Sequence, residues 1–467
     1  MLEMKIKKRL FILVYLLSCF FLSVNFFKGG VINNGDYGRV THSMNITTEP
    51  WKPLSEIYPI QTKTDGSFIR ELPSSSLGVI GYIIYKSINY FGGAEINTTY
   101  IKIFLHLLFF LGLTFLLKES ASLFEFIINI GLAIIIISHG FLMNSLYEEA
   151  VIVAILPFLI FSLKNIINNE KILPFLFFSS ALIVSKAQMF FVFPVILFIL
   201  FISIKDKFSY KFIFSFIFIS ILSFSYIFTV NYFYQGVKEA NNYNRFYNGI
   251  GYSLQDVADW PTNEFYERNI YFYGNKKELQ IKSNQYFSKD TQDLAGTGYW
   301  PTGSDMRNSI NSENIDQSEK DILERKIKEA NSKNYVNIIL ENPKTIYKIL
   351  ENSIKTAFLS DNSIKYIRNP NEVSDIFSKI SIFISKDIYK IIFLIYILSL
   401  FVFYKNILFV FYASYVVLGF PVFVVLGDGY YEFEKHLAPY IILFIFFYSA
   451  LYFITIAGKK SLKTINS

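Results

Sequence analysis

Long uninterrupted runs of apolar residues constrain this chain more than any other feature. Most runs have about 18 to 22 residues, enough for a helix to cross a hydrocarbon core of about 30 Å. With 52% hydrophobic residues over 467 positions, the expected fold is an all-α polytopic membrane protein with about ten transmembrane helices. The predicted spans lie near residues 10–27, 99–117, 123–141, 146–163, 172–184, 188–204, 211–231, 387–404, 406–426 and 437–457.

Basic residues are distributed unequally between the two sides of these spans. Cytoplasmic loops are enriched in Lys and Arg, so the side with most lysines is predicted to be cytoplasmic, together with both termini. That side carries Lys118, Lys164, Lys171, Lys205, Lys207, Lys211, Lys405, Lys459, Lys460 and Lys463, whereas the short outer loops carry Lys186 and Lys435. The richness in Ile, Phe, Lys, Asn and Tyr is typical of an AT-rich bacterial genome, which predicts a bacterial cytoplasmic membrane.

The chain is expected to have three parts. Residues 1–231 form an N-terminal transmembrane module with a first outer loop at 28–98, residues 232–385 form a partly helical outer insert, and residues 386–467 form the last helices. In the first outer loop, segment 77–91 is half apolar, which predicts an interfacial or re-entrant helix. In the insert, residues 335–358 have helical spacing with Pro343 near the middle, which predicts two helices with a break at Asn342-Pro343.

Several function classes lack their usual sequence signatures. The sequence has no Walker A loop, no dinucleotide fingerprint, no Gly-x-Ser-x-Gly elbow and no HExxH motif. Its single cysteine, Cys19, provides no disulfide framework. Strongly charged residues are scarce in the spans, which disfavours a proton-coupled transporter. The net charge of +7 follows the predicted helix orientation and does not indicate nucleic-acid binding.

The stretch Gly35-Asp36-Tyr37-Gly38-Arg39 follows shortly after the first predicted span. Glycines allow a tight turn, and an Asp close to an Arg can be held ionised and oriented. Asp36 is therefore a candidate catalytic residue and Arg39 a candidate substrate-binding residue. The alternative is an ordinary exposed turn with a local ion pair.

Two more outer loops carry charge at a predicted membrane boundary. Glu148 and Glu149 precede the fourth span, where acidic residues also serve as helix caps. Successive helical side chains point about 100° apart, so at most one of the two is expected to face the bundle, with Glu149 favoured as catalytic and Glu148 as substrate-binding. Lys186 is a candidate ligand for a lipid-linked phosphate, with interfacial snorkelling as the alternative.

The stretch 427–436, before the last span, mixes carboxylates with basic side chains. At helical spacing Glu432 would share a face with Lys435 and His436, and the three are candidate substrate-binding residues. A solvated helix cap is the alternative. A metal site for Mg²⁺ or Mn²⁺ built from acidic residues is left open, and no metal ligand is assigned.

With Asp36 in the first outer loop, the helix expected at 77–91, many spans and a large outer insert, the chain resembles the GT-C superfamily of integral-membrane glycosyltransferases. The stretches 35–40 and 427–436 resemble those of bacterial WsfD-like hexose transferases of surface glycan biosynthesis. The family often pairs its first-loop Asp with a second acidic residue, whereas Tyr37 follows Asp36 here.

The resemblance implies transfer of a sugar from a polyprenyl-phosphate donor to a glycan acceptor on the outer face of the membrane. Asp36 would be the general base of an inverting displacement. Lys186, with Arg39 or Lys435, would neutralise the leaving phosphate. Trp260, Tyr299 and Trp300 are candidates for stacking on sugar rings, or for packing alone. The alternatives are a surface-polysaccharide polymerase or ligase and a lipid-linked glycan flippase or other transporter.

Overall fold

A computed structural model of the chain describes most of the helical parts. The description covers residues 31, 36–48, 55–61, 73–119, 123–169, 171–204, 209–233, 235–251, 330–359, 387–403, 406–429 and 433–465, and the isolated positions 317, 321, 324, 328 and 383. These residues are mostly helical, as expected. The predicted first span at 10–27 and the candidates Glu432, Trp260, Tyr299 and Trp300 lie outside the described residues.

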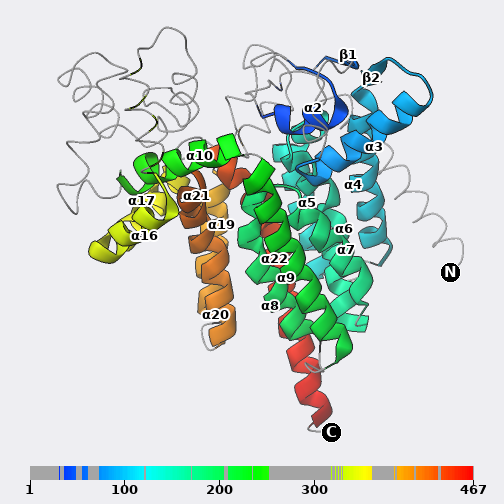
Figure 1. Cartoon of the computed structure of the whole chain (residues 1–467). Coiled ribbons are helices and arrows are strands. Elements are labelled where there is room, and N and C mark those ends of the chain that lie inside the picture. Colours follow the sequence, from blue (N-terminus) through cyan, green and yellow to red (C-terminus); the bar gives the residue numbers. More distant parts are fainter. Residues whose placement is uncertain are drawn as a thin grey trace, which may run out of the picture. The chain divides into compact units, whose positions relative to one another are not determined.

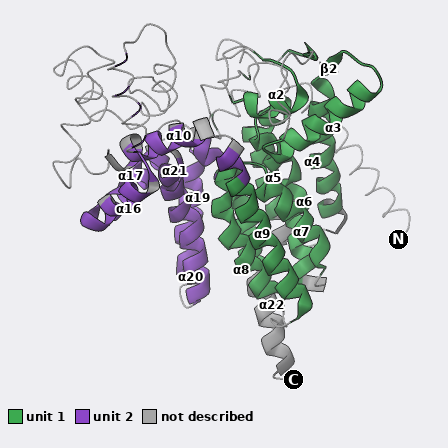
Figure 2. Cartoon of the chain, viewed as in Figure 1, with its two compact units in different colours: residues 1–228, 363–385, 441–467 green, residues 229–362, 386–440 purple. Residues whose placement is uncertain are grey.

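The chain divides into two compact units (Figure 2). The first comprises residues 1–228, 363–385 and 441–467, and the second residues 229–362 and 386–440. Each unit thus contains segments that are far apart in the sequence, and the boundaries differ from a simple division into consecutive parts. The long helix α22 (Phe433–Ile465) contributes to both units.

The first unit is a bundle of helices with a small cap of α2, α3 and two strands at one end (Figure 1). Its elements are α2 (Gly38–Met44), β1 (Ile57–Pro59), α3 (Ser76–Tyr90), β2 (Glu95–Asn97), α4 (Thr99–Glu119), α5 (Leu123–His139), η2 (Gly140–Asn144), α6 (Glu149–Asn169), α7 (Ile172–Ile183), η3 (Ala187–Val192), α8 (Phe193–Ser203) and most of α9 (Tyr210–Phe233). The strands pair antiparallel, with Tyr58 opposite Ile96. The helix predicted at 77–91 is confirmed as α3.

The second unit is described from its helices alone. They are α10 (Gln235–Tyr243), the π-helical η4 (Asn244–Gly251), α16 (Ser332–Glu341), α17 (Lys344–Leu359), α19 (Ile388–Phe403), α20 (Ile407–Ser414), the π-helical η7 (Tyr415–Gly419), α21 (Phe420–Asp428) and the start of α22. The helix break predicted at Asn342-Pro343 is confirmed, because α16 ends at Glu341 and α17 begins at Lys344. Proline at the start of a helix removes no helical hydrogen bond, which places the break there.

Six helical segments of the described residues are long and apolar enough to cross a membrane, which makes the chain a multi-pass membrane protein. They are Thr99–Leu116, Ile127–Asn144, Glu149–Ile167, Tyr210–Tyr232, Ile407–Gly427 and Lys435–Tyr452. Three more predicted spans correspond to shorter apolar helical segments, Ile172–Ile183, Ala187–Ser203 and Ile388–Phe403. At a rise of 1.5 Å per residue, these shorter segments extend less than the thickness of a typical hydrocarbon core.

Helix α6 is the core of the first unit. It packs against α4 and α7, and most of its residues are buried, including Ala150, Ala154 and Leu159, which have no exposed surface. Gly112 of α4 makes close packing possible, since a Cβ there would lie 2.8 Å from the ring of Phe158 in α6. The first residue of α6, Glu149, therefore belongs to a deeply buried helix of the unit.

Helix α3 is fixed at its start to the end of α7. The backbone N–H of Ser76 donates to the carbonyl of Val184 at 2.8 Å, and its hydroxyl donates to the carbonyl of Ala181 at 3.0 Å. Ser75 caps the helix by accepting from the N–H of Gly78 at 3.1 Å. These bonds bring the segment that precedes α3 beside the short loop that follows α7.

Candidate functional site

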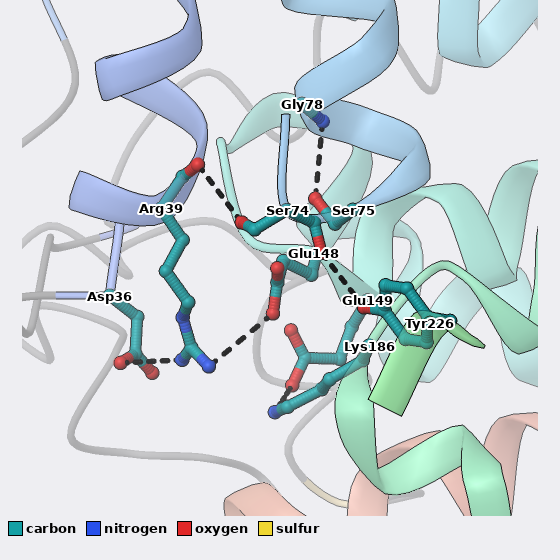
Figure 3. A network of polar contacts seen from close by, with 9 residues as sticks. All are labelled: Asp36, Arg39, Ser74, Ser75, Gly78, Glu148, Glu149, Lys186 and Tyr226. Atoms are coloured by element: carbon teal, nitrogen blue, oxygen red, sulfur yellow. Dashed lines mark hydrogen bonds and ion pairs between the residues drawn. The ribbon is translucent and has the colours of Figure 1, made fainter. Parts of the chain in front are cut away.

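Arg39 lies between two carboxylates from different loops. Its Nη2 is 2.8 Å from Oδ1 of Asp36, and its Nη1 is 3.5 Å from Oε2 of Glu148 (Figure 3). One turn residue separates Asp36 from the start of α2, and Glu148 lies in the turn before α6. The guanidinium, with its rigid fork of donors, can contact both groups at once.

A second ion pair lies beside the first. Nζ of Lys186, in the loop between α7 and η3, contacts Oε1 of Glu149 at the start of α6 (Figure 3). The side chains of Lys186 and Glu149 are 3% and 5% exposed, whereas those of Asp36 and Arg39 are 27% and 24% exposed. The site therefore has a buried inner pair and an outer pair that solvent or a ligand can reach.

The five charged side chains influence one another strongly. Burial by itself would lower the pKa of Arg39, but the negative charges of Glu148, Asp36 and Glu149 raise it above its ordinary value, so this guanidinium stays charged. Burial raises the pKa of Glu148, an effect opposed by the positive charges of Arg39 and Lys186. With all groups ionised, three carboxylates face two cations, so the cluster carries one net negative charge.

An aromatic contact brings the two loops of the site together. Tyr37 and Tyr147 meet edge to face with ring centroids 4.8 Å apart, a favoured arrangement for aromatic pairs. Both are almost fully buried, and burial together with the neighbouring Tyr147 raises the pKa of the Tyr37 phenol well above its ordinary value. Because Tyr37 adjoins Asp36 and Tyr147 adjoins Glu148, this contact sets the spacing of the acidic groups.

Hydrogen bonds from a third loop and from α9 support Arg39. The hydroxyl of Ser74 donates to the backbone carbonyl of Arg39 at 3.3 Å, and the hydroxyl of Tyr226 in α9 donates to the carbonyl of Ser74 at 2.8 Å (Figure 3). Sequence reasoning missed both residues. A tyrosine inside an apolar span requires a hydrogen-bond partner, and this requirement is the one signal that points to Tyr226.

The structure thus brings together five of the predicted site residues, Asp36, Arg39, Glu148, Glu149 and Lys186. One expectation about them is wrong. Glu148 and Glu149 were expected to point apart, with at most one facing the bundle, yet both are buried. The helical angle between neighbours does not apply, because α6 begins at Glu149 and Glu148 lies in the preceding turn.

Two further candidates, Lys435 and His436, belong to the second unit. Lys435 and His436 lie in the first turn of α22, and both are buried, at 4% and 7% exposure. Among the residues that the structure describes, no group of three or more His, Cys, Asp or Glu side chains is placed to hold a metal ion.

Chemically, the cluster combines a reachable carboxylate, a reachable guanidinium and a buried ion pair behind them. Such a set can accept a proton at Asp36 and bind an anion at Arg39. Comparison of the sequence with protein-family models and with curated proteins, and of the structure with solved structures, finds no match.

Proposed function

We propose that this protein is a GT-C-type membrane glycosyltransferase. In this proposal it moves a hexose from a polyprenyl-phosphate donor to a cell-surface glycan or a lipid-linked acceptor, on the outer face of a bacterial cytoplasmic membrane. The observation that carries the proposal is the pairing of a partly exposed Asp36 with a partly exposed Arg39, backed by buried charges at the end of apolar helices. A lipid-linked sugar places its reacting carbon at the membrane surface, where apolar helices end.

Asp36 is the proposed general base. The acceptor hydroxyl attacks the anomeric carbon of the donor while its proton passes to the Asp36 carboxylate. The bond between the anomeric carbon and the phosphate oxygen breaks, and the electron pair leaves with the polyprenyl phosphate. A single displacement of this kind inverts the anomeric configuration.

Arg39 is the proposed ligand of the leaving phosphate. Lys186 shared this role in the prediction from sequence, but it is 3% exposed and paired with Glu149, whereas Arg39 is 24% exposed. A planar guanidinium also matches the geometry of phosphate oxygens. Glu149, predicted as a second catalytic carboxylate, is almost as deeply buried as its partner Lys186. In the proposal the Glu149–Lys186 pair contributes fixed charges beside Arg39 and does not contact the substrate.

Glu148 supplies the acidic neighbour that the family resemblance leads one to expect beside the first-loop Asp. Tyr37 follows Asp36 in the sequence, but Glu148 approaches the same guanidinium from the loop before α6. Two carboxylates on one arginine keep its charge fixed and its fork oriented. In the proposal this arrangement orients Arg39 toward the leaving phosphate.

The test is a sugar-transfer assay with the full chain in membrane vesicles, using radiolabelled glucose, mannose or galactose on polyprenyl phosphate as donor. Asp36→Asn is expected to lower turnover about 100-fold or more, the usual contribution of a general base. Asp387→Asn is the matched control, because Asp387 also pairs with a cation three residues later, Lys390, and is about half exposed. It should transfer sugar at the unaltered rate.

Two results would reject this proposal. Unchanged turnover in Asp36→Asn removes Asp36 from the mechanism. Loss of activity in Arg39→Ala and His436→Ala, with Asp36→Asn still active, favours a surface-polysaccharide polymerase or ligase, since such an enzyme would depend on outer-loop Arg and His side chains.

A further inference from the structure

Helix α9 makes an unusual contribution to the site for a helix that is so exposed. Only 17% of its apolar segment Tyr210–Tyr232 is buried. Large side chains such as Phe214, Phe218 and Phe228 are exposed along the helix. Phe224 contacts Phe190 in η3 and Phe193 at the start of α8. Tyr226 is half buried, and its hydroxyl reaches across to the loop before α3.

The bond made by Tyr226 continues to Arg39. Its hydroxyl donates to the carbonyl of Ser74 at 2.8 Å, and the hydroxyl of Ser74 donates to the carbonyl of Arg39 at 3.3 Å. The next residue, Ser75, caps α3. The two serines therefore join α9, α2 and α3 at one point, directly behind the arginine whose side chain contacts Asp36 and Glu148.

We propose that Tyr226 is a positioning residue for Arg39. Inside an apolar span, water does not replace a hydrogen bond that a phenol loses. Breaking the bond from Tyr226 to Ser74 is therefore costly, and the bond is maintained. A fixed Ser74 in turn fixes the backbone of Arg39 at the first turn of α2, and with it the direction of the guanidinium. The part of this inference that concerns catalysis rests on the proposed function, in which Arg39 receives the charge of the leaving phosphate.

The experiment compares Tyr226→Phe with Tyr210→Phe in the full chain. Tyr226→Phe removes the hydroxyl and keeps the ring, and Tyr210 lies on the same helix with 77% exposure. The first measurement is hydrogen–deuterium exchange of a peptide that covers residues 36–48. We expect several-fold faster exchange in Tyr226→Phe and in Ser74→Ala, and wild-type exchange in Tyr210→Phe.

The second measurement is sugar transfer from the same polyprenyl-phosphate hexoses. Tyr226→Phe is expected to lower kcat about fivefold, as expected for loss of one hydrogen bond, with the donor KM changed less than twofold. The split arises because the charge on the leaving phosphate grows in the transition state, where the direction of Arg39 matters most.

The outcomes separate the two proposals. Faster exchange at 36–48 with no transfer by the wild type from any of the three donors keeps the link from Tyr226 to Arg39 and rejects the proposed function. Unchanged exchange at 36–48, or faster exchange over the whole chain, overturns the positioning role. Locally faster exchange with an unaltered kcat also overturns it, because the bond would then be structural alone.

Discussion

Lys186 and Glu149 form an ion pair that is almost completely removed from solvent, with side chains 3% and 5% exposed. Both belong to the first unit: Lys186 lies in the loop between α7 and η3, and Glu149 is the first residue of α6. Charges buried to this degree are stable as a pair and costly alone. The consequences can be measured without knowledge of the substrate.

Removal of one member of this pair should destabilise the protein strongly. We expect Lys186→Met to lose about 3–5 kcal/mol of unfolding free energy, because the carboxylate of Glu149 is left buried and uncompensated. The double variant Lys186→Met/Glu149→Leu should recover most of that loss. Thermal unfolding of the detergent-solubilised chain measures both, with Lys348→Met, at the more exposed pair with Glu351, as the control. A double variant no more stable than the single one contradicts the prediction.

Glu148 should make stability depend on pH. Burial raises its pKa in the folded protein above the ordinary value of 4.5, so the folded state holds the proton more tightly than the unfolded state. The contribution of Glu148 to the unfolding free energy is therefore largest below about pH 4.5 and decreases as the pH rises through the raised pKa. Glu148→Gln, which cannot ionise, should gain thermal stability relative to the wild type between pH 4.5 and pH 8.

The comparison must be made as a difference between variant and wild type at each pH. Glu351→Gln, which removes a more exposed carboxylate, is measured alongside as the control for the substitution itself. A constant difference between Glu148→Gln and the wild type across this range would show that folding does not change the pKa of Glu148, and would contradict the prediction.

Arg39→Lys should behave almost like Arg39→Ala in sugar transfer. The two terminal nitrogens of Arg39 contact two different carboxylates, Asp36 at 2.8 Å and Glu148 at 3.5 Å. A single ammonium group cannot reproduce that fork. We expect kcat/KM to fall at least about tenfold in each variant. A loss of this size corresponds to one charge-assisted hydrogen bond, which contributes about 1.5–3 kcal/mol. Near-normal transfer by Arg39→Lys would mean that the charge alone suffices.

Gly38 of α2 and Gly81 of α3 should respond in opposite ways to substitution by alanine. A Cβ on Gly81 of α3 would lie 2.7 Å from Cγ of Met44 in α2, whereas a Cβ on Gly38 would meet nothing within 4 Å. Alanine is favoured over glycine in helices by about 1 kcal/mol, so Gly38→Ala should be neutral or stabilising. Gly81→Ala should lower the melting temperature and the transfer activity, because it displaces α2.

The clash between the added methyl group at position 81 and Met44 can be relieved by shortening the side chain at position 44. Met44→Ala in the Gly81→Ala background should restore part of the activity, since it makes room for the added methyl group. If the double variant is less active than Gly81→Ala alone, the close approach of α2 to α3 does not set the position of Arg39.

Much of this architecture follows from patterns that a sequence carries directly. Apolar runs predict the long helices, a proline predicts the break after Glu341, and the half-apolar segment 77–91 predicts α3. The distribution of basic residues predicts that Asp36, Glu149 and Lys186 lie on the same side of the membrane, and the structure brings these three residues into one cluster. Their catalytic roles remain predictions.

The partners of Arg39 could not be obtained in the same way. The contact between Arg39 and Glu148 depends on the packing of Tyr37 against Tyr147, and residue spacing does not encode contacts between distant loops. The burial of both Glu148 and Glu149 depends on which residue begins α6, a boundary that sequence patterns locate only to within a few residues. The hydrogen bonds of Ser74 involve backbone carbonyls, which no side-chain pattern predicts.

The order of the charged residues along the chain has a consequence for synthesis. Asp36 and Arg39 leave the ribosome well before Glu148, Glu149 and Lys186, and Tyr226 follows last. At about 5–20 residues per second, Arg39 precedes Lys186 by roughly 7 to 30 s. Throughout that interval Lys186 is missing from the cluster, and α9, which carries Tyr226, is made later still. The site therefore forms as a late event of membrane insertion, after α9 has been synthesised.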